Sequence, residues 1–486
     1  MTAVLPKQSH IVTPAEHEAF ARLSGDHNPL HLDALYARRL MFGGCVTHGV
    51  HLLLRALETY AQTHEDVGAL VRLGARFFSA THPGEAVQVE MQTDRDNHSG
   101  IVVTDVHRRV VAKVQAEWSG LRPASISLLS HAPPQGNACE RLSDAGIANG
   151  GGSFPLFLDP SAAAYLFPRL SSALPATQLA AILGTTYVIG MRLPGHDSIF
   201  SSLNLSFTDT LTADHPDLVY KTQNFSAERR FCRIAVSSPG MSGFLEAFVR
   251  PAPAVQPSFS GIQALIEPDL FAGQHALVVG GSRGLGEVCA KLLAAGQAHV
   301  TLTYREGAAD ARRVVAELAD AGASAGALRL DARDAEFPEL AAFLSSGGRI
   351  TDLYYFATPP IFTETRQFAY TAFLEFSDIY IHALARLFEM LSGPSNDGWL
   401  RGVWLPSSVA VDTRPEDMTA YIMAKQAMEY LATDWSRKYP RIHFAAPRLP
   451  RLTTDQTVTL SPVPAEEPAP VLAGLLQSFA KGRHTS

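Results

Sequence analysis

The chain of 486 residues is 46% hydrophobic, 18% charged and 9% aromatic, an ordinary globular composition that excludes a disordered or fibrous protein. Its 40 basic and 47 acidic side chains give a net charge of −7, which excludes the basic field that nucleic-acid binding requires. At about 150 residues per domain, the length predicts three domains.

The sequence shows neither a membrane segment nor a disulfide pattern. No run approaches the roughly eighteen apolar residues of a membrane span, and the first residues lack a signal-peptide core. The cysteines, Cys45, Cys139, Cys232 and Cys289, are scattered singly, without the spacing of a metal or redox site. We therefore expect a soluble, cytoplasmic protein with no bound metal, no membrane contact and no nucleic-acid partner.

A pattern of one helix followed by alternating strands occurs twice in the first 250 residues. In the first copy a helical stripe begins at Val50, and in the second copy residues 176–190 form the helix. One helix wrapped by a curved antiparallel sheet would bury both apolar faces. The expected strands are 71–77, 87–91 and 110–118 in the first copy, and 203–207, 218–225 and 231–238 in the second.

Two stretches predict the domain boundaries. Residues 123–160 are rich in Pro, Gly and Ser and include Gly-Gly-Gly-Ser at 150–153, and a second Pro-rich stretch covers 251–261. The predicted parts are a first domain over 1–122, a linker over 123–154, a second domain over 155–252 and a third over 262–486.

The third domain alternates short apolar runs with helical patterns such as 287–293 and 309–318. Runs with little alternation are typical of strands covered on both faces, so a doubly wound parallel α/β sheet is predicted. The expected strands are 275–280, 299–304, 327–330, 352–357, 402–406 and 442–446.

The first candidate site combines an acid, an imidazole and a helix start. Asp26 and His31 flank an Asn28-Pro29 turn, and Thr47-His48-Gly49 opens the first helix. The N–H of Gly49 could polarise a thioester carbonyl while Asp26 and His31 move a proton. His27 and His48 are interpreted as structural, and Cys45, with no identified base, is not expected to be a nucleophile.

These residues resemble a known family. Gly25-Asp26-x-Asn28-Pro29-Leu30-His31 followed by Thr47-His48-Gly49 is similar to the MaoC-like (R)-specific enoyl-thioester hydratases and dehydratases of hot-dog fold. The resemblance covers most of residues 10–120 and implies that Asp26 and His31 are the catalytic pair, with the Gly49 amide as oxyanion donor.

The second copy also resembles this fold, over residues 193–207, but has no Asp-x-Asn-Pro-x-His of its own. The resemblance implies an α+β double hot-dog with one degenerate half. That half either makes room for a bulky acyl tail or completes the sheet and a dimer surface.

The second candidate site begins with a glycine-rich turn after the strand that ends at Val279. The turn, Gly280-Gly281-Ser282-Arg283-Gly284-Leu285-Gly286, would bring a helix N-terminus against a pyrophosphate. The next strand ends at Tyr304-Arg305 with no acidic side chain at its tip, so Arg283 and Arg305 favour the 2′-phosphate of NADPH over NADH; a solvated surface arginine is the alternative for each.

Downstream, Ser408 follows a predicted strand, and Tyr421 and Lys425 share one face of a predicted helix. A neighbouring ammonium and the oxidised nicotinamide would lower the pKa of a phenol, which would then protonate a carbonyl oxygen as hydride arrives. Ser408 would hydrogen-bond the same oxygen.

This pattern resembles the short-chain dehydrogenases/reductases of Rossmann-type fold over roughly residues 272–455. The resemblance implies an adenine contact at Asp331, although a turn-forming aspartate is an alternative. Three segments depart from the family pattern: Phe356-Ala357-Thr358-Pro359, Tyr380-Ile381-His382-Ala383 and Pro447-Arg448. His382 or a water is a candidate to replace the family's helix asparagine.

Together the sites predict an NADPH-dependent 3-oxoacyl-thioester reductase joined to a 3-hydroxyacyl-thioester dehydratase, as in fatty-acid-like or polyketide synthesis. Fusion would raise the local concentration of the shared intermediate. The alternatives are hydration followed by oxidation, as in β-oxidation, and a dehydratase with a non-catalytic docking domain. The acyl chain would be carried on coenzyme A or an acyl carrier protein, and a homodimer is the default assembly.

Overall fold

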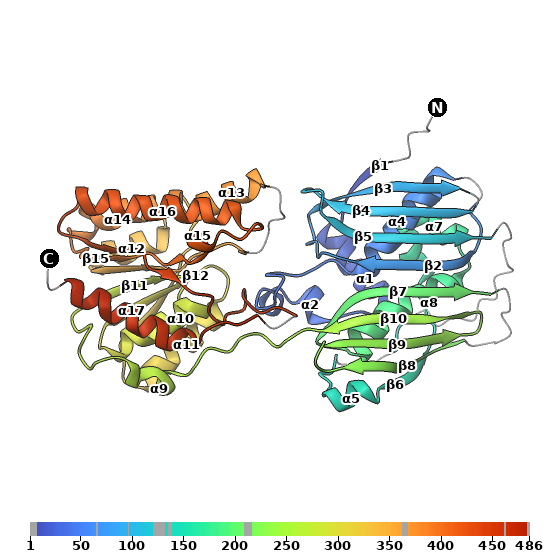
Figure 1. Cartoon of the computed structure of the whole chain (residues 1–486), viewed down its shortest axis with the longest axis horizontal. Helices are drawn as coiled ribbons and strands as arrows, with labels where there is room; N and C mark the ends of the chain where they lie inside the picture. The colour runs from blue at the N-terminus through green and yellow to red at the C-terminus, as the bar shows by residue number, and fades with distance from the viewer. Residues whose placement is uncertain are drawn as a thin grey trace. The chain divides into compact units, whose positions relative to one another are not determined.

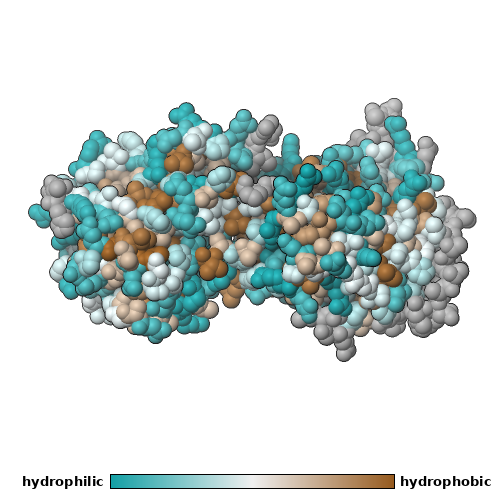
Figure 2. All heavy atoms as spheres, turned by 60° about the horizontal axis from the view of Figure 1, so that its bottom comes forward, coloured by the Kyte–Doolittle hydropathy of each residue, from teal (hydrophilic) through white to brown (hydrophobic). Residues whose placement is uncertain are grey.

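The computed structural model describes residues 7–64, 67–95, 97–119, 132–134, 139–208, 216–361, 368–460 and 463–483. The chain divides into two compact units, one built mainly from Met1–Ala252 and the other mainly from Pro253–Val458 and Pro462–Ser486 (Figure 1). Within the described ranges, no helix is both long enough and apolar enough to span a bilayer. On the face that Figure 2 shows, hydrophobic residues are interspersed among hydrophilic ones.

The first unit is built on one ten-stranded sheet in the order β1-β3-β4-β5-β2-β7-β10-β9-β8-β6, in which neighbouring strands pair antiparallel. The strands are β1 (Lys7–Ile11), β2 (Leu70–Phe77), β3 (Ala86–Arg95), β4 (His98–Asp105), β5 (Val110–Trp118), β6 (Gly151–Pro155), β7 (Ser198–Phe207), β8 (Asp217–Ser226), β9 (Phe231–Ser238) and β10 (Met241–Val249). The helices are α1 (Pro14–Ser24), α2 (Pro29–Leu32), α3 (Ala34–Ala37), α4 (Gly49–Thr63), α5 (Asp144–Ala148), α6 (Pro160–Leu166), α7 (Pro168–Ala173) and α8 (Ala176–Tyr187), which continues as the π-helix η1 (Val188–Arg192).

The same strand order occurs twice, counted outward from the middle of this sheet. The first half runs β2-β5-β4-β3-β1 and the second runs β7-β10-β9-β8-β6. The halves join where β2 pairs with β7, with Leu73 opposite Leu205. Each half contributes one long helix, α4 or α8, that packs against the sheet, and a single apolar core extends under both halves.

Part of the predicted linker over 123–154 is instead regular structure. Residues 144–148 form α5, and β6 pairs with β8 at the edge of the sheet. A Cβ on Gly152 would lie 2.8 Å from the Tyr220 hydroxyl oxygen, so this glycine allows close strand packing rather than flexibility. Residues 123–131 and 135–138 of the predicted linker lie outside the described residues.

The second unit is a doubly wound α/β domain whose six-stranded parallel sheet has the order β13-β12-β11-β14-β15-β17. Apolar clusters line the sheet and its covering helices, as strands buried on two faces require. The strands are β11 (His275–Val279), β12 (His299–Tyr304), β13 (Ala325–Arg329), β14 (Asp352–Tyr355), β15 (Gly402–Trp404) and β17 (His443–Ala445), with a separate pair β16 (Ser407–Ser408) and β18 (Arg448–Leu449). The helices are α9 (Phe259–Ile262), η2 (Gln263–Leu265), α10 (Gly284–Ala295), α11 (Ala308–Asp320), α12 (Pro338–Ser345), α13 (Tyr370–Ser377), η3 (Asp378–Ala383), α14 (Leu384–Ser392), η4 (Pro394–Asn396), α15 (Ala410–Thr413), α16 (Thr419–Lys438) and α17 (Pro468–Arg483). The six predicted strands of the sheet are confirmed, with ends that differ by a few residues.

The buried carboxylate of Glu58 ties the two halves of the first unit together. It lies on α4, and its oxygens accept hydrogen bonds from the N–H groups of Leu170 (2.7 Å) and Arg169 (3.2 Å) in the first turn of α7.

Glu58→Ala would leave these N–H groups without their acceptor, at a cost of about 2–4 kcal/mol in the free energy of unfolding. We expect faster amide hydrogen exchange over 169–173, whereas the control Glu90→Gln on the exposed face of β3 should leave that exchange unchanged.

Candidate active sites

Asp26 lies in the loop that follows α1, with its side chain buried. Gly25 ends the helix with φ +68°, a left-handed conformation that glycine adopts without strain. One carboxylate oxygen of Asp26, Oδ2, accepts a hydrogen bond from Thr186 Oγ1 at 2.6 Å, and Oδ1 accepts one from the Asn28 N–H at 3.2 Å. The carboxylate is therefore held in one orientation by donors from both halves of the unit.

His31 lies in the short helix α2, and its ring faces Asp26. Its Nδ1 lies 2.7 Å from the carbonyl oxygen of Val46; since a carbonyl can only accept, Nδ1 carries the hydrogen and Nε2 of the neutral ring is left as a base. Burial lowers the pKa of His31, while the charge of Asp26 opposes this. Asp26, His31 and His48 each place one polar atom within 4.8 Å of the others, so the structure brings the predicted pair together.

His48 is also part of this site, although the sequence analysis interpreted it as structural. Its ring stacks on that of His31 with 3.7 Å between centroids, and its Nε2 donates to the Asp26 carbonyl oxygen at 3.0 Å. Burial and the neighbouring rings of His31 and His17 hold the pKa of His48 well below its usual value. A neutral His48 supports the Asp26 loop and one face of His31. By contrast, His27 is exposed.

Gly49 is the first residue of α4, as predicted. A Cβ at this position would lie 3.0 Å from the Phe77 ring, so the close packing admits only glycine without a shift of the ring. The N–H groups of a first helical turn have no intrahelical acceptor, and the side chain of His48, at the N-cap position, makes no capping hydrogen bond to this turn. The start of α4 can therefore offer an N–H to an oxygen that carries developing negative charge.

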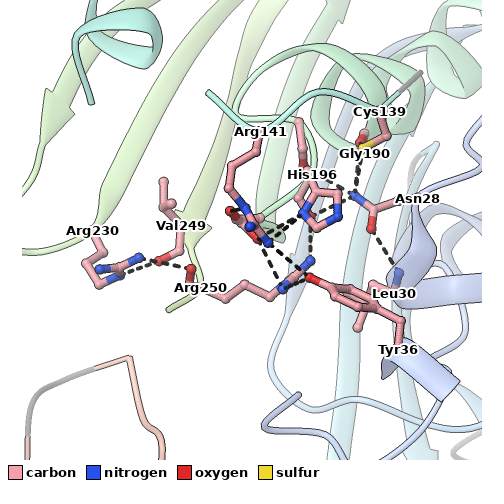
Figure 3. A network of polar contacts seen from close by, with 12 residues as sticks. Asn28, Leu30, Tyr36, Cys139, Arg141, Gly190, His196, Arg230, Val249 and Arg250 are labelled. Carbon is pink, nitrogen blue, oxygen red and sulfur yellow. Dashed lines mark hydrogen bonds and ion pairs between the residues drawn. The ribbon is translucent and has the colours of Figure 1, made fainter. Parts of the chain in front are cut away.

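The amide of Asn28 connects this loop to the second half of the unit (Figure 3). Its Nδ2 donates to the carbonyl oxygens of Gly190 (2.9 Å) and Gly195 (3.2 Å), and its Oδ1 accepts from the Leu30 N–H (3.0 Å). Asn28 thus caps the start of α2 and fixes it against η1.

An ion-pair network that joins the buried Arg250 to the exposed Arg141 through Asp197 lies beside this connection. Arg250 is only 1% exposed; it donates to the Tyr36 hydroxyl at 3.0 Å and pairs with Asp197 at 3.3 Å, while Arg141 pairs with Asp197 at 2.6 Å (Figure 3). Burial alone would raise the pKa of Asp197, but hydrogen bonds from His196 and Arg141 and the charge of Arg250 outweigh it and bring the pKa to about 2. The network fixes α3 against the end of β10.

The second candidate site is a glycine-lined turn between β11 and α10. Gly280 has φ +76°, and a Cβ on Gly286 would lie 2.2 Å from the Gly280 carbonyl oxygen. Gly284, at the start of α10, has open space where its Cβ would be. A turn closed on its inner side and open at a helix N-terminus fits the pyrophosphate of a dinucleotide.

The other residues expected to contact the nucleotide each have an identified place or partner in the structure. Arg283 directly precedes α10 and pairs with Asp455 at 3.3 Å, and Arg305 follows β12 and pairs with Glu306 at 2.9 Å. Ser282 is buried and Leu285 is partly buried at the start of α10. Asp331 accepts a hydrogen bond from the Arg333 N–H at 3.0 Å, which is the turn-forming alternative considered for it.

Ser408, Tyr421 and Lys425 come together between β16 and α16. Ser408 hydrogen-bonds the Tyr421 hydroxyl, and Lys425 Nζ donates to the Pro406 carbonyl oxygen at 2.7 Å. Burial raises the pKa of Tyr421 to about 12, partly offset by Ser408, and lowers the pKa of Lys425 to about 7 against the charge of Glu429. Lys425 is not among the groups that shift the pKa of Tyr421 here, since its Nζ donates to Pro406 and lies 5.9 Å from the centre of the Tyr421 ring. The lowering by Lys425 together with the oxidised nicotinamide stays a prediction.

Tyr380 is a site residue that the sequence analysis did not identify. Lys425 Nζ lies 3.8 Å from the centre of its ring, a cation–π contact, and its hydroxyl hydrogen-bonds Thr358 Oγ1. Two of the three departures from the family pattern thus contact each other beside Lys425. His382 was a candidate to replace the helix asparagine of the short-chain dehydrogenases/reductases. It is instead exposed on η3 and pairs with Asp378.

The third departure also has a structural account. Arg448 donates to both carboxylate oxygens of Glu429 on α16, at 2.9 and 2.7 Å, and β18 pairs with β16 at Ser407–Arg448. Arg448 therefore fixes the segment after β17 to the strand that carries Ser408.

Buried neutral histidines predict acid sensitivity of the first unit. Burial lowers the pKa values of His17, His48 and His51, and neither ring nitrogen of His51 has a hydrogen-bond partner in the part of the chain that the structure describes. As pH falls below about 6.5, the unfolded chain takes up protons that these folded histidines resist, so the free energy of unfolding decreases. For His48 and His51, whose pKa values lie well below the usual one, this loss is about 1 kcal/mol each at pH 5.5. Urea titrations at pH 7.5 and 5.5 measure this loss.

His51→Leu should reduce this pH dependence of the free energy of unfolding, because it removes one histidine that resists protonation in the folded state while retaining an apolar contact with Phe20. The exposed His27→Gln is the control for replacing a histidine in this region. Equal free energies of unfolding at both pH values in the unmodified chain would contradict the prediction.

Comparisons with known proteins agree with this division of the chain. Residues 2–115 match the MaoC like domain family, and residues 274–443 match the short chain dehydrogenase family. A fatty acid synthase beta subunit from Cochliobolus carbonum is 25% identical over 107 residues, which is 22% of this chain and 5% of that protein. The chain thus spans a small fraction of that relative.

Several solved structures are similar to part of this chain. A dehydrogenase/reductase from Sinorhizobium meliloti is 25% identical, covering 46% of this chain and 91% of its own, with a TM-score of 0.37. An NADP complex of RhlG from Pseudomonas aeruginosa is 22% identical, covering 44% and 92%, with a TM-score of 0.39. A 3-oxoacyl (acyl-carrier-protein) reductase from Agrobacterium tumefaciens with NADP bound is 22% identical, covering 38% and 74%, with a TM-score of 0.34.

Proposed function

The chain joins a MaoC-like domain to a short-chain dehydrogenase domain, and from this premise we propose that it catalyses two consecutive reactions on one acyl thioester. The second unit reduces a 3-oxoacyl thioester with NADPH, and the first unit removes water from the resulting 3-hydroxyacyl thioester. The observation that carries the proposal is the convergence of Asp26 and His31 in front of the start of α4.

The dehydration can be written with the groups of the first unit alone. The Gly49 N–H donates to the thioester carbonyl oxygen and stabilises the enolate that forms as the C2 proton leaves. The Asp26–His31 pair takes that proton and returns a proton to the departing 3-hydroxyl, so the C2–H and C3–O bonds break, a C2=C3 bond forms and one water is released. The neutral His31 that this requires is the form that burial favours.

We propose that the first unit is two hot-dog folds side by side. The identical strand order on both sides of the β2–β7 pair supports this assignment. The second half lacks the Asp-x-Asn-Pro-x-His sequence, so the unit has one proton-transfer pair.

The second unit would hold NADPH along the turn 280–286, with Arg283 and Arg305 near the 2′-phosphate. When bound, the nucleotide supplies the hydride for C3 of the substrate. Tyr421 is protonated at neutral pH, as its pKa of about 12 indicates, and donates this proton to the carbonyl oxygen, while Ser408 donates a hydrogen bond that orients the same oxygen. Lys425, with a pKa of about 7, can exchange a proton with its surroundings at neutral pH.

Two single substitutions should separate the activities. Asp26→Asn should lower dehydration by about 10²–10⁴-fold and retain reduction, because the amide cannot accept the transferred proton. Tyr421→Phe should have the reverse effect, because the phenyl ring has no proton to donate. NADPH oxidation with a 3-oxoacyl thioester measures the first step, and mass spectrometry of the enoyl product from a supplied 3-hydroxyacyl thioester measures the second.

Each variant is the control for the other, since it shows that the untouched unit is folded and active. If Tyr421→Phe left every activity unchanged, the second unit would instead be a non-catalytic docking domain. Parallel reactions with coenzyme A and carrier-protein thioesters identify the carrier.

Nucleotide choice tests the direction of the reaction. We expect NADPH to bind more tightly than NADH, and Arg283→Ala and Arg305→Ala each to weaken NADPH binding about 10-fold with little effect on NADH, because each would remove a charge-assisted contact to the 2′-phosphate. Arg312→Ala on α11 is the matched control. Tighter binding of NAD⁺ would favour hydration followed by oxidation, and fluorescence titration of the nucleotides decides between the two directions.

A further inference from the structure

We propose that the second half of the first unit supplies a positioning residue to the dehydratase site, and that this residue is Thr186. The inference rests on the proposed dehydration at Asp26 and His31. It assigns a role in the reaction to a half of the unit that has no proton-transfer pair of its own.

The first observation concerns two neighbouring threonines in α8. Thr185 Oγ1 donates to the Ile182 carbonyl oxygen at 2.6 Å, which is how a buried threonine within a helix usually satisfies its hydroxyl. Thr186 Oγ1 donates instead to Asp26 Oδ2, also at 2.6 Å, across 160 residues of sequence. Both threonines are buried, so each hydroxyl needs a partner, but only that of Thr186 is directed to the site.

The second observation is the shape of η1, the helical turn that continues α8. A Cβ on Gly190 would lie 2.1 Å from Asp26 Oδ1 and 2.5 Å from Oδ2. Asp26 therefore packs directly against the backbone at Gly190, and only glycine admits it there. The Gly190 carbonyl oxygen in turn accepts from Asn28 Nδ2 at 2.9 Å.

These contacts leave the Asp26 carboxylate little freedom to rotate. Thr186 fixes one oxygen, the Asn28 N–H fixes the other, and Gly190 closes one side. A carboxylate has about four lone-pair directions, so two remain for a water or a substrate hydroxyl. Proton transfer depends steeply on the position of the accepting oxygen, and the hydrogen bond from the Thr186 hydroxyl holds the Asp26 carboxylate in that position.

The test compares three variants at adjacent positions. Thr186→Val keeps the shape of the side chain and removes the donor, and we expect kcat for hydration of a trans-2-enoyl thioester to fall about 10- to 100-fold with KM changed less than about threefold, the range of one hydrogen bond to a charged group. Thr186→Ser restores a hydroxyl and should recover most of kcat. Thr185→Val removes the neighbouring hydroxyl, which does not contact the site, and should retain wild-type kcat.

The outcomes separate this inference from the proposed function. If the wild-type protein hydrates the thioester and Asp26→Asn does not, while Thr186→Val retains full kcat, Thr186 is not a positioning residue and the dehydratase assignment stands. Equal losses in Thr186→Val and Thr185→Val, or no recovery in Thr186→Ser, would show a packing effect and overturn the inference. A wild-type protein with no hydration activity would overturn the dehydratase assignment and the inference with it.

Discussion

The contact between the Asp26 loop and the π-helical turn η1 is the constraint on which the first site depends. Asn28 donates its amide to Gly190 from 162 residues away, and Asp26 packs its carboxylate against the same glycine. A buried carboxylate and a buried amide are costly unless they are hydrogen-bonded, so each group requires the other half of the unit to be in place. Folding of both halves is therefore a condition for assembling the site.

The continuous sheet holds the two segments of this long-range contact in a fixed arrangement. Because β2 and β7 pair in a fixed antiparallel register, the helices that precede them, α4 and α8, are held on the same continuous sheet with a shared core. The start of α4 carries Gly49, and the end of α8 carries Thr186. The repeat of one topology thus brings unlike ends of two similar helices to one place, where one offers N–H groups and the other a hydroxyl.

Local sequence patterns were sufficient to predict the parallel sheet of the second unit and the residues at its turns. A strand covered on both faces requires an apolar run and a tight turn requires glycine, and both are visible in a few neighbouring residues. The convergence of Asp26 with His31 was also predictable, since they are five residues apart on the two sides of one turn. Thr186 and Tyr380 were not, because their roles depend on partners far away in sequence, Asp26 in one case and Lys425 in the other. The glycines of β6 were misinterpreted as a flexible linker for the same reason: composition does not reveal that Tyr220 packs against them.

Burial favours the uncharged form of the acid–base groups in both sites. In the first unit it lowers the pKa of His31, so that the ring is neutral and can accept a proton at neutral pH. In the second it raises the pKa of Tyr421 to about 12, so that the phenol keeps the proton it is to donate. At pH 7 the imidazole is therefore available as a base and the phenol carries a proton. The raised pKa also makes the phenol a weaker acid than an exposed tyrosine, so desolvation sets the protonation state of both groups but does not strengthen the acid.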